Sequence, residues 1–256
     1  MARRIPEIFI IGIMKGGTTI LYDYLCTHPR VVPGSRKEIH YFSLYSDRGP
    51  EWYLSHFPDR DERVLSIDAS PTYFDVASTP AIPGFIKTAA PNAKVLLIIR
   101  DPVERAVAHF NHLKLVSHKD SFKDVDINEF FSRSLEGCYS KKTLYDEHLD
   151  HILTFSRYYH KFLWYTQVFG QKNVLVVTST ELGNNPTETM QRIFKYCGLE
   201  WVPSSLFGVH SYVTGSDVRH LEAAVGERLA RILYPDFKNF CLAAGLPYRQ
   251  ESDYVC

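Results

Sequence analysis

The segment that most constrains the fold runs from Glu7 to Leu25 and reads EIFIIGIMKGGTTILYDYL. A run of apolar, largely β-branched residues ends in a turn with one lysine, two glycines and two threonines, after which the apolar residues return at helical spacing. A strand, a glycine turn and a helix N-terminus direct backbone N–H groups and the positive end of the helix dipole toward one point. The sequence therefore predicts a cradle for a phosphate, or for a group of similar shape and charge.

Alternating strands and helices follow this segment along the chain. Such alternation indicates βαβ crossovers, and so an α/β fold with a central, mostly parallel sheet flanked by helices. The expected strands are Ile8–Ile13, a more polar one from Arg63 to Ser70, Lys94–Arg100 and Asn173–Ser179. The expected helices are Thr19–Thr27, Ala81–Ala90, one from Asp101 to Leu115, Tyr158–Phe169, Pro186–Tyr196 and an amphipathic stretch from Arg219 to Ala244 that Pro235 breaks. The segment from Ser117 to Asp146 is polar and weakly patterned, as in an excursion that shapes a substrate cleft.

Composition narrows the class of protein. A length of 256 residues suits one α/β domain over 1–256, and 29 basic residues balance 29 acidic ones, which gives no global signal for nucleic acid. No apolar run approaches the roughly 20 residues of a membrane span. Five scattered cysteines without C-x-x-C spacing argue against a disulfide framework or a zinc site. We expect a cytoplasmic protein without a membrane span, monomeric or a weak homodimer.

The lysine of the first turn is displaced relative to a Walker A loop. In G-x-x-x-x-G-K-[ST] the lysine follows the last glycine and reaches the outer phosphates, whereas Lys15 precedes Gly16 and Gly17. A lysine inside the turn is better placed beside a single bridging oxygen. A tight turn without function is the alternative, and Thr18 and Thr19 favour the phosphate site.

A second candidate anion site follows the strand that ends near residue 100. Arg100 ends this strand, Asp101 can cap the next helix, and Pro102 occupies the favoured first helical position. The arginine is either incidental to a well-made helix start or a bidentate phosphate ligand on the same sheet edge as the first turn. Two anion sites on one edge suggest a nucleotide with phosphates at both ends.

Glu38 and His40 form the third candidate element, in the sequence SRKEIHYF. If this segment is extended, residues two apart point to the same side. A carboxylate beside an imidazole can remove a proton from an acceptor hydroxyl. An exposed charged loop without catalytic function is the alternative.

Together these motifs resemble a known family. IIGIMKGGTT, KEIHYF, WYLSHFP, DASPTYF and LLIIRDPVERA occur in the order and approximate spacing of PAPS-dependent sulfotransferases, and are most similar to the heparan sulfate glucosaminyl sulfotransferase branch. The resemblance extends from Pro6 to about Leu246. It implies the three-layer, P-loop-type sulfotransferase fold, with 3'-phosphoadenosine 5'-phosphosulfate (PAPS) as donor, 3'-phosphoadenosine 5'-phosphate (PAP) as product and no metal.

The resemblance also implies a role for each motif residue. Lys15 would contact the bridging oxygen of the phosphosulfate, and Gly16, Gly17, Thr18 and Thr19 would cradle the 5'-phosphate. Arg100 would hold the 3'-phosphate. Glu38 matches the catalytic base of that branch, and His40 the histidine beside it. Ser156 matches a serine near the donor or the cleft, and Gly215 and Arg219 fall in the late donor-binding loop.

Two positions and one loop depart from the family pattern. Ala108 stands where a serine usually shares the 3'-phosphate, and Ala69 where the branch carries a lysine. The late loop is altered around Thr214, Gly215 and Ser216, where Arg219 or His220 would compensate. These departures weaken the heparan assignment more than the donor assignment.

The predicted activity is in-line transfer of a sulfonate to a hydroxyl, or an amine, of a small metabolite, lipid or glycan. A small-molecule kinase that uses ATP and magnesium is one alternative, and the displaced lysine argues against it. A non-catalytic nucleotide-binding protein is another, and Lys15, Glu38 and His40 argue against that.

Overall fold

The computed structural model describes residues 3–75, 80–116, 124–135, 144–209 and 220–248. The chain divides into two compact units. One comprises residues 1–100 and 163–212, and the other comprises residues 101–162 and 213–256. Gly215 and Arg219, with the rest of the predicted late loop, lie outside the described residues. No helix in these ranges is both long enough and apolar enough to cross a membrane.

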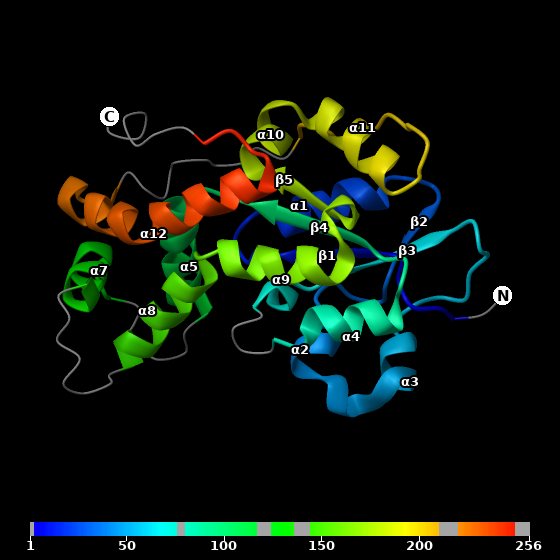
Figure 1. The fold of residues 1–256 in the computed structure, drawn as a ribbon, viewed down its shortest axis with the longest axis horizontal. Coiled ribbons are helices and arrows are strands. Elements are labelled where there is room, and N and C mark those ends of the chain that lie inside the picture. Colours follow the sequence, from blue (N-terminus) through cyan, green and yellow to red (C-terminus); the bar gives the residue numbers. More distant parts are fainter. Residues whose placement is uncertain (1–2, 76–79, 117–123, 136–143, 210–219, 249–256) are drawn as a thin grey trace. The chain divides into compact units, whose positions relative to one another are not determined.

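The first unit is built on a parallel sheet of five strands (Figure 1). The strand order is β2-β3-β1-β4-β5, and every neighbouring pair is parallel. The strands are β1 (Ile8–Gly12), β2 (Val31–Pro33), β3 (Leu65–Ala69), β4 (Lys94–Ile99) and β5 (Val174–Thr178). The four strands expected from the sequence are present, and β2 is a three-residue edge strand too short to give a periodic signal.

Helices cover both faces of this sheet, which confirms the predicted α/β class. In Figure 1, α1 (Thr18–Cys26), α10 (Ser179–Asn184) and α11 (Pro186–Tyr196) lie on one side of the strands, and α4 (Ile82–Ala89) lies on the other. The short elements α2 (Tyr41–Leu44), η1 (Ser46–Arg48), α3 (Gly49–Leu54), η2 (Pro71–Phe74) and η3 (Gln171–Asn173) complete the unit, together with part of α9 (Tyr159–Phe169).

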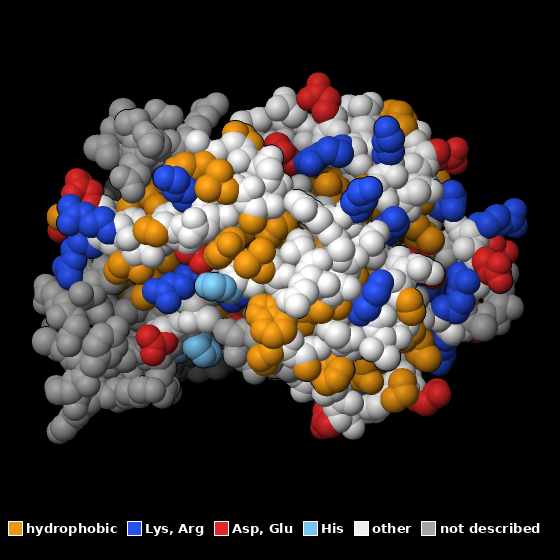
Figure 2. All heavy atoms as spheres, viewed as in Figure 1, with side chains coloured by type: hydrophobic (Ala, Val, Ile, Leu, Met, Phe, Trp, Pro, Cys, Tyr) orange, Lys and Arg blue, Asp and Glu red, His pale blue; other side chains and the backbone are white. Residues whose placement is uncertain are grey.

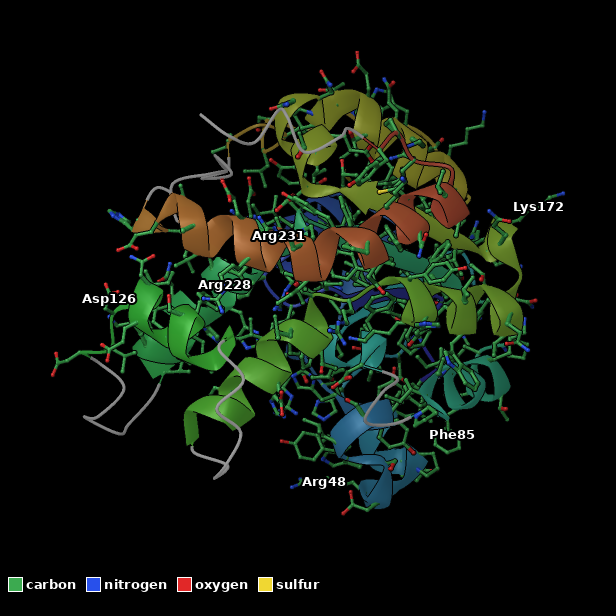
Figure 3. All side chains as sticks on the ribbon, turned by 60° about the vertical axis from the view of Figure 1, so that its left-hand side comes forward. Arg48, Phe85, Asp126, Lys172, Arg228 and Arg231 are labelled. Atoms are coloured by element: carbon green, nitrogen blue, oxygen red, sulfur yellow. The ribbon has the colours of Figure 1, made fainter. Side chains whose placement is uncertain are left out.

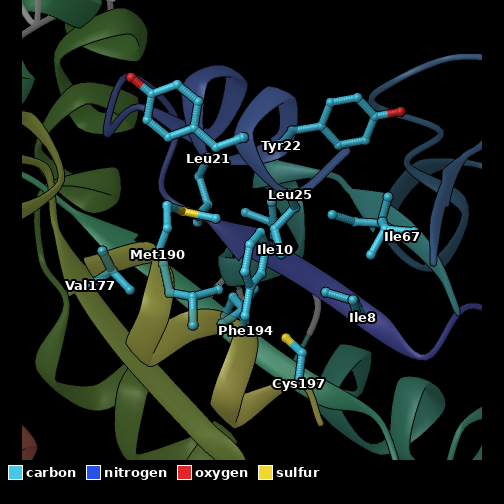
Figure 4. Close-up of a cluster of buried hydrophobic side chains, with 14 of the residues drawn as sticks. Ile8, Ile10, Leu21, Tyr22, Leu25, Ile67, Val177, Met190, Phe194 and Cys197 are labelled. Carbon is cyan, nitrogen blue, oxygen red and sulfur yellow. The ribbon is translucent and has the colours of Figure 1, made fainter. Parts of the chain in front are cut away.

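The core between the sheet and α1/α11 fixes the position of the glycine turn. Figure 4 shows Ile8 and Ile10 of β1 packed among Leu21 and Leu25 of α1 and Phe194 of α11, all of them buried. Side chains two apart on the strand and four apart on the helix share this core, as the two periodicities require. The turn between β1 and α1 is therefore anchored at both ends.

The second unit is helical. Its helices are α5 (Pro102–Val116), α7 (Ile127–Leu135), α8 (Leu144–Phe155) and α12 (Ala223–Ala244), which share a core of buried residues that includes Phe110, Phe131, Ile152 and Leu229.

One helix of this unit was not expected from the sequence, and the expected break at Pro235 was wrong. Part of the polar segment from Ser117 to Asp146 forms α7, because Ile127, Phe130 and Phe131 supply a short apolar face that the polar surroundings mask in the sequence. The final helix continues through Pro235 as one element of 22 residues. Proline removes one i to i−4 hydrogen bond, and burial of Leu233, Tyr234, Phe240 and Cys241 on either side offsets that loss.

Candidate active site

The glycine turn lies at the carboxyl edge of the sheet, between the two strands that flank β1. The Ile13 amide donates to the Ile98 carbonyl of β4 at 2.8 Å, and the Gly16 amide donates to the Ile13 carbonyl at 3.0 Å. Because β1 lies between β3 and β4, segments that follow all three strands meet at this edge. This is where parallel α/β sheets bind ligands.

The turn itself is shaped to receive a phosphate. A Cβ added to Gly16 would lie 2.9 Å from the Ile98 carbonyl oxygen, so only glycine allows this approach to β4. Gly17 adopts a φ of 104° at the N-cap of α1, where no side chain caps the helix and no acidic residue occupies the first turn. The dipole and first amides of α1 are thus not opposed by a carboxylate. Thr18 is buried and Thr19 is exposed.

Arg100 directly follows β4, next to the turn that follows β1. Its side chain is nearly buried, with 9% of the residue exposed. Asp101 accepts hydrogen bonds from the amides of Val103 and Glu104 at 2.9 and 3.0 Å, so the predicted helix cap is present. Two of the predicted anion ligands, Lys15 and Arg100, therefore follow adjacent parallel strands.

Glu38 and His40 come together, but not by the predicted route. The segment is not extended, because Glu38 and His40 have φ values of 62° and 57°. This left-handed backbone brings His40 Nε2 to 3.6 Å from Glu38 Oε2. On the other side of the carboxylate, Lys37 Nζ lies 2.5 Å from Oε1.

These contacts keep Glu38 ionised. Its interaction with His40 is the largest cause that lowers the pKa of Glu38 to about 2, against the opposing effect of partial burial, and Lys37 lowers the pKa further. At neutral pH the carboxylate can accept a proton. Both of its oxygens, however, already face a basic group.

Left-handed backbone singles out the same residues that the sequence motifs selected. Among the described residues, the non-glycine residues with positive φ are Lys15, Glu38 and His40. Such conformations cost on the order of 1–3 kcal/mol each and cluster at functional sites.

A buried carboxylate supports the Glu38–His40 segment. Asp68, at the end of β3, is 1% exposed and accepts hydrogen bonds from Tyr53, Tyr73 and Ser70, the Ser70 hydroxyl at 2.7 Å. Burial raises the pKa of Asp68. Ser70 Oγ in turn accepts the His40 amide at 3.0 Å, so Asp68 and Ser70 hold the backbone at His40.

The imidazole of His40 has its own anchor. His40 Nδ1 lies 2.8 Å from Thr72 Oγ1, which lies 2.6 Å from Ser43 Oγ. With Nδ1 bound to Thr72, Nε2 faces Glu38. The sequence reasoning missed Asp68, Ser70 and Thr72, although polar residues two apart directly after a strand were a usable signal.

Ala69, which replaces the family lysine, is buried in the core between the sheet and α1. Its carbonyl oxygen accepts the Glu38 amide at 3.2 Å. Through this hydrogen bond, the backbone of residue 69 holds the backbone of Glu38, the candidate base. Ala108, the other departure in the described part of the chain, is 6% exposed in α5 of the second unit.

Ser156 belongs to a buried network in the second unit. It accepts from Arg105 Nε at 2.9 Å and donates to the Ile152 carbonyl at 2.8 Å. Arg105 is fully buried, also bonds the Ile152 carbonyl and His109 Nδ1, and its pKa is lowered to about 10 by burial, so it is charged at neutral pH. The Ser156 hydroxyl thus makes both of these hydrogen bonds, one accepted and one donated, to residues of the second unit.

Replacement of Ser156 by Ala should destabilise the protein by about 1–3 kcal/mol, because the buried Arg105 Nε loses its acceptor. Urea unfolding measures this change, with the exposed Ser205→Ala as a control expected within about 0.5 kcal/mol of the original. A Ser156→Ala variant of unchanged stability but weaker PAP binding would instead support the role that the family resemblance implies.

Comparisons with known proteins identify a family for this chain. The family model described as a sulfotransferase domain matches residues 6–224. Over 215 residues the chain is 29% identical to the bifunctional heparan sulfate N-deacetylase/N-sulfotransferase 1 of Caenorhabditis briggsae, an alignment that covers 78% of this chain and 23% of that protein. The chain thus spans less than a quarter of that relative.

Two solved structures share the fold. A sulfotransferase from Alicyclobacillus acidocaldarius superposes with a TM-score of 0.75 at 22% identity, over 97% of this chain and 98% of that one. Mouse sulfotransferase SULT7A1, crystallised with PAP, has a TM-score of 0.56 at 12% identity, over 93% and 85% of the two chains.

Proposed function

Because the chain belongs to the sulfotransferase domain family, we propose that it transfers a sulfonate group from PAPS to a hydroxyl, or an amine, of an acceptor molecule. The observation that carries this proposal is that two motifs with left-handed backbone lie at the carboxyl ends of adjacent strands: Lys15 follows β1, and the Glu38 amide is bound to Ala69 at the end of β3. The donor is named from the family and from the PAP-bound structural neighbour.

In this proposal the turn after β1 binds the 5'-phosphate. Its glycines allow close approach of the backbone, the N-terminus of α1 favours the negative charge, and Lys15 stabilises the charge that develops on the bridging oxygen as the sulfonate leaves. Arg100 binds the 3'-phosphate through its guanidinium. These roles stay predictions for this chain.

Glu38 accepts the proton of the acceptor as the bond from the acceptor oxygen to sulfur forms. Its low pKa keeps it ionised before the reaction, and His40, fixed by Thr72, orients its second oxygen. The sulfur–oxygen bond to the 5'-phosphate breaks, and its electron pair stays on the phosphate. No proton needs to reach the leaving group.

The acceptor class remains the broad one of small metabolites, lipids and glycans. Acidic and basic residues are equal in number, and on the face in Figure 2 lysines and arginines occur in several separate places rather than in one continuous basic surface. A long acidic polysaccharide would favour such a surface. We therefore propose a compact acceptor rather than heparan sulfate.

The transfer reaction tests this function directly. The protein is incubated with PAPS and separate acceptor panels of alcohols, amines, lipids and glycans, and both PAP release and the sulfated product are measured by mass spectrometry. Acceptor-dependent release of PAP supports the proposal. Phosphoryl transfer from ATP with magnesium, without any sulfated product, would contradict it.

Replacement of Thr72 by Val should lower kcat about fivefold, because the His40 ring loses one hydrogen bond worth about 1 kcal/mol. Binding of PAP should be unchanged, since Thr72 does not belong to the donor cradle. Thr72→Ser keeps the hydroxyl and should keep the rate. Equal losses in Thr72→Ser and Thr72→Val would argue against the hydrogen bond as the cause.

A further inference from the structure

The ion pair between Lys37 and Glu38 engages one oxygen of the candidate base in the free protein. A general base must come within about 2.6–3.2 Å of the acceptor oxygen. Lys37 Nζ lies 2.5 Å from Glu38 Oε1, and His40 Nε2 lies 3.6 Å from Oε2. An acceptor hydroxyl that approaches Oε1 therefore competes with Lys37, and one that approaches Oε2 competes with His40.

His40 is the less movable of the two. Its amide is bound to Ser70 and its ring to Thr72. Within the described part of the chain, Glu38 is the one hydrogen-bond partner of the Lys37 ammonium. A lysine side chain rotates on a flexible four-carbon stem. Lys37 is thus the group that the acceptor hydroxyl displaces from Glu38 Oε1.

The displaced ammonium lies close to the sulfur that is transferred. The acceptor oxygen that replaces Lys37 at Oε1 forms its new bond to that sulfur, so the sulfonate oxygens come to lie two bonds from the acceptor oxygen. As Glu38 takes up the proton it becomes neutral and loses its attraction for Lys37. The negative charge of the sulfonate then attracts the ammonium.

We propose that Lys37 is a catalytic residue that moves from Glu38 to the sulfonate when the acceptor binds. This inference rests on the proposed function. Lys37 thus forms an ion pair with Glu38 in the free enzyme and binds the transferred sulfonate during the reaction. No proton passes through Lys37: the acceptor proton goes to Glu38, and the leaving electron pair goes to the phosphate.

The first test compares turnover in Lys37→Met and Lys37→Arg. Loss of a donor to developing charge lowers kcat on the order of 10²-fold, so Lys37→Met should show that loss with PAP affinity unchanged. Lys37→Arg keeps the charge and should stay within about tenfold of the original rate. Lys172→Met is the matched control for loss of one positive charge, because Lys172 is exposed and projects from the edge of the molecule in Figure 3.

The second test needs no turnover. Glu38→Gln removes the negative charge that holds Lys37, so this variant should bind PAPS about tenfold more tightly relative to PAP than the original protein does. Addition of Lys37→Met should abolish that gain. Calorimetric titration with PAPS and with PAP measures both affinities. It is carried out on the original protein, Lys37→Met, Glu38→Gln and the double variant.

The two hypotheses fail in different ways. A protein that binds neither PAPS nor PAP overturns the proposed function and the role of Lys37 with it. A protein that transfers sulfonate, but in which Lys37→Met keeps kcat within about threefold and leaves the PAPS preference of Glu38→Gln intact, overturns the role of Lys37 alone.

Discussion

Replacement of Glu38 by Gln should lower kcat on the order of 10²- to 10⁴-fold, the usual contribution of a general base. Gln is close to Glu in shape, but its amide cannot accept the acceptor proton. Affinity for PAP should stay within about threefold, because Glu38 follows β2 and contacts Ala69, whereas the donor cradle follows β1. Single-turnover rates with saturating PAPS measure the chemical step alone.

The control for this variant is Glu51→Gln, a carboxylate exposed in α3 in the same part of the sequence. It should keep the original rate. If Glu38→Gln turned over at a near-normal rate while Glu51→Gln did the same, Glu38 would not be the base. His40, whose Nε2 lies beside it, would then be the next residue to test.

Replacement of Gly16 by Ala should weaken PAP binding on the order of 10²-fold. The added Cβ would lie 2.5 Å from Ile13 Cγ1, 2.9 Å from the Ile98 carbonyl oxygen and 3.1 Å from the Ile13 carbonyl oxygen, and two of these neighbours are backbone atoms that cannot rotate away. The turn must therefore move off β4 and misdirect its amides. Loss of two charge-assisted hydrogen bonds, at about 1.5 kcal/mol each, accounts for an effect of this size.

Gly84→Ala is the matched control for this substitution. Gly84 lies inside α4, and a Cβ there would meet nothing within 4 Å. Alanine should stabilise this helix by up to about 1 kcal/mol and leave PAP binding unchanged. Normal PAP affinity in a folded Gly16→Ala variant would show that the turn does not bind the phosphate.

The parallel sheet was predictable because its strands are buried on both faces and so appear as continuous apolar runs. Ile8–Gly12, Lys94–Ile99 and Val174–Thr178 all have this pattern. The edge strand Val31–Pro33 has too few residues to show it. The helix α7 was missed because its buried residues are local and few, and α12 was misjudged because tertiary packing overrides the effect of Pro235.

The candidate site was predictable where chemistry is concentrated in short motifs. Residue type and spacing pointed to Lys15, Glu38, His40 and Arg100 as candidates. They did not point to the residues that hold these side chains in place. Asp68 contacts Tyr53, fifteen positions away, and Thr72 contacts His40 from thirty-two positions away. Such pairings depend on how the segment between β2 and β3 packs against the end of β3, which no local pattern reveals. The ion pair of Lys37 with Glu38 depends on a left-handed backbone, where the sequence suggested an extended one.

Calorimetric titration with PAP, beside a titration with ATP and magnesium, tests the central claim most directly. The account predicts that PAP binds without a divalent cation and that ATP with magnesium binds far more weakly, since Lys15 lies inside the turn and the two predicted anion ligands, Lys15 and Arg100, follow adjacent strands. Preference for ATP with magnesium, or no binding of PAP, would contradict the assignment of the donor and favour a phosphotransferase.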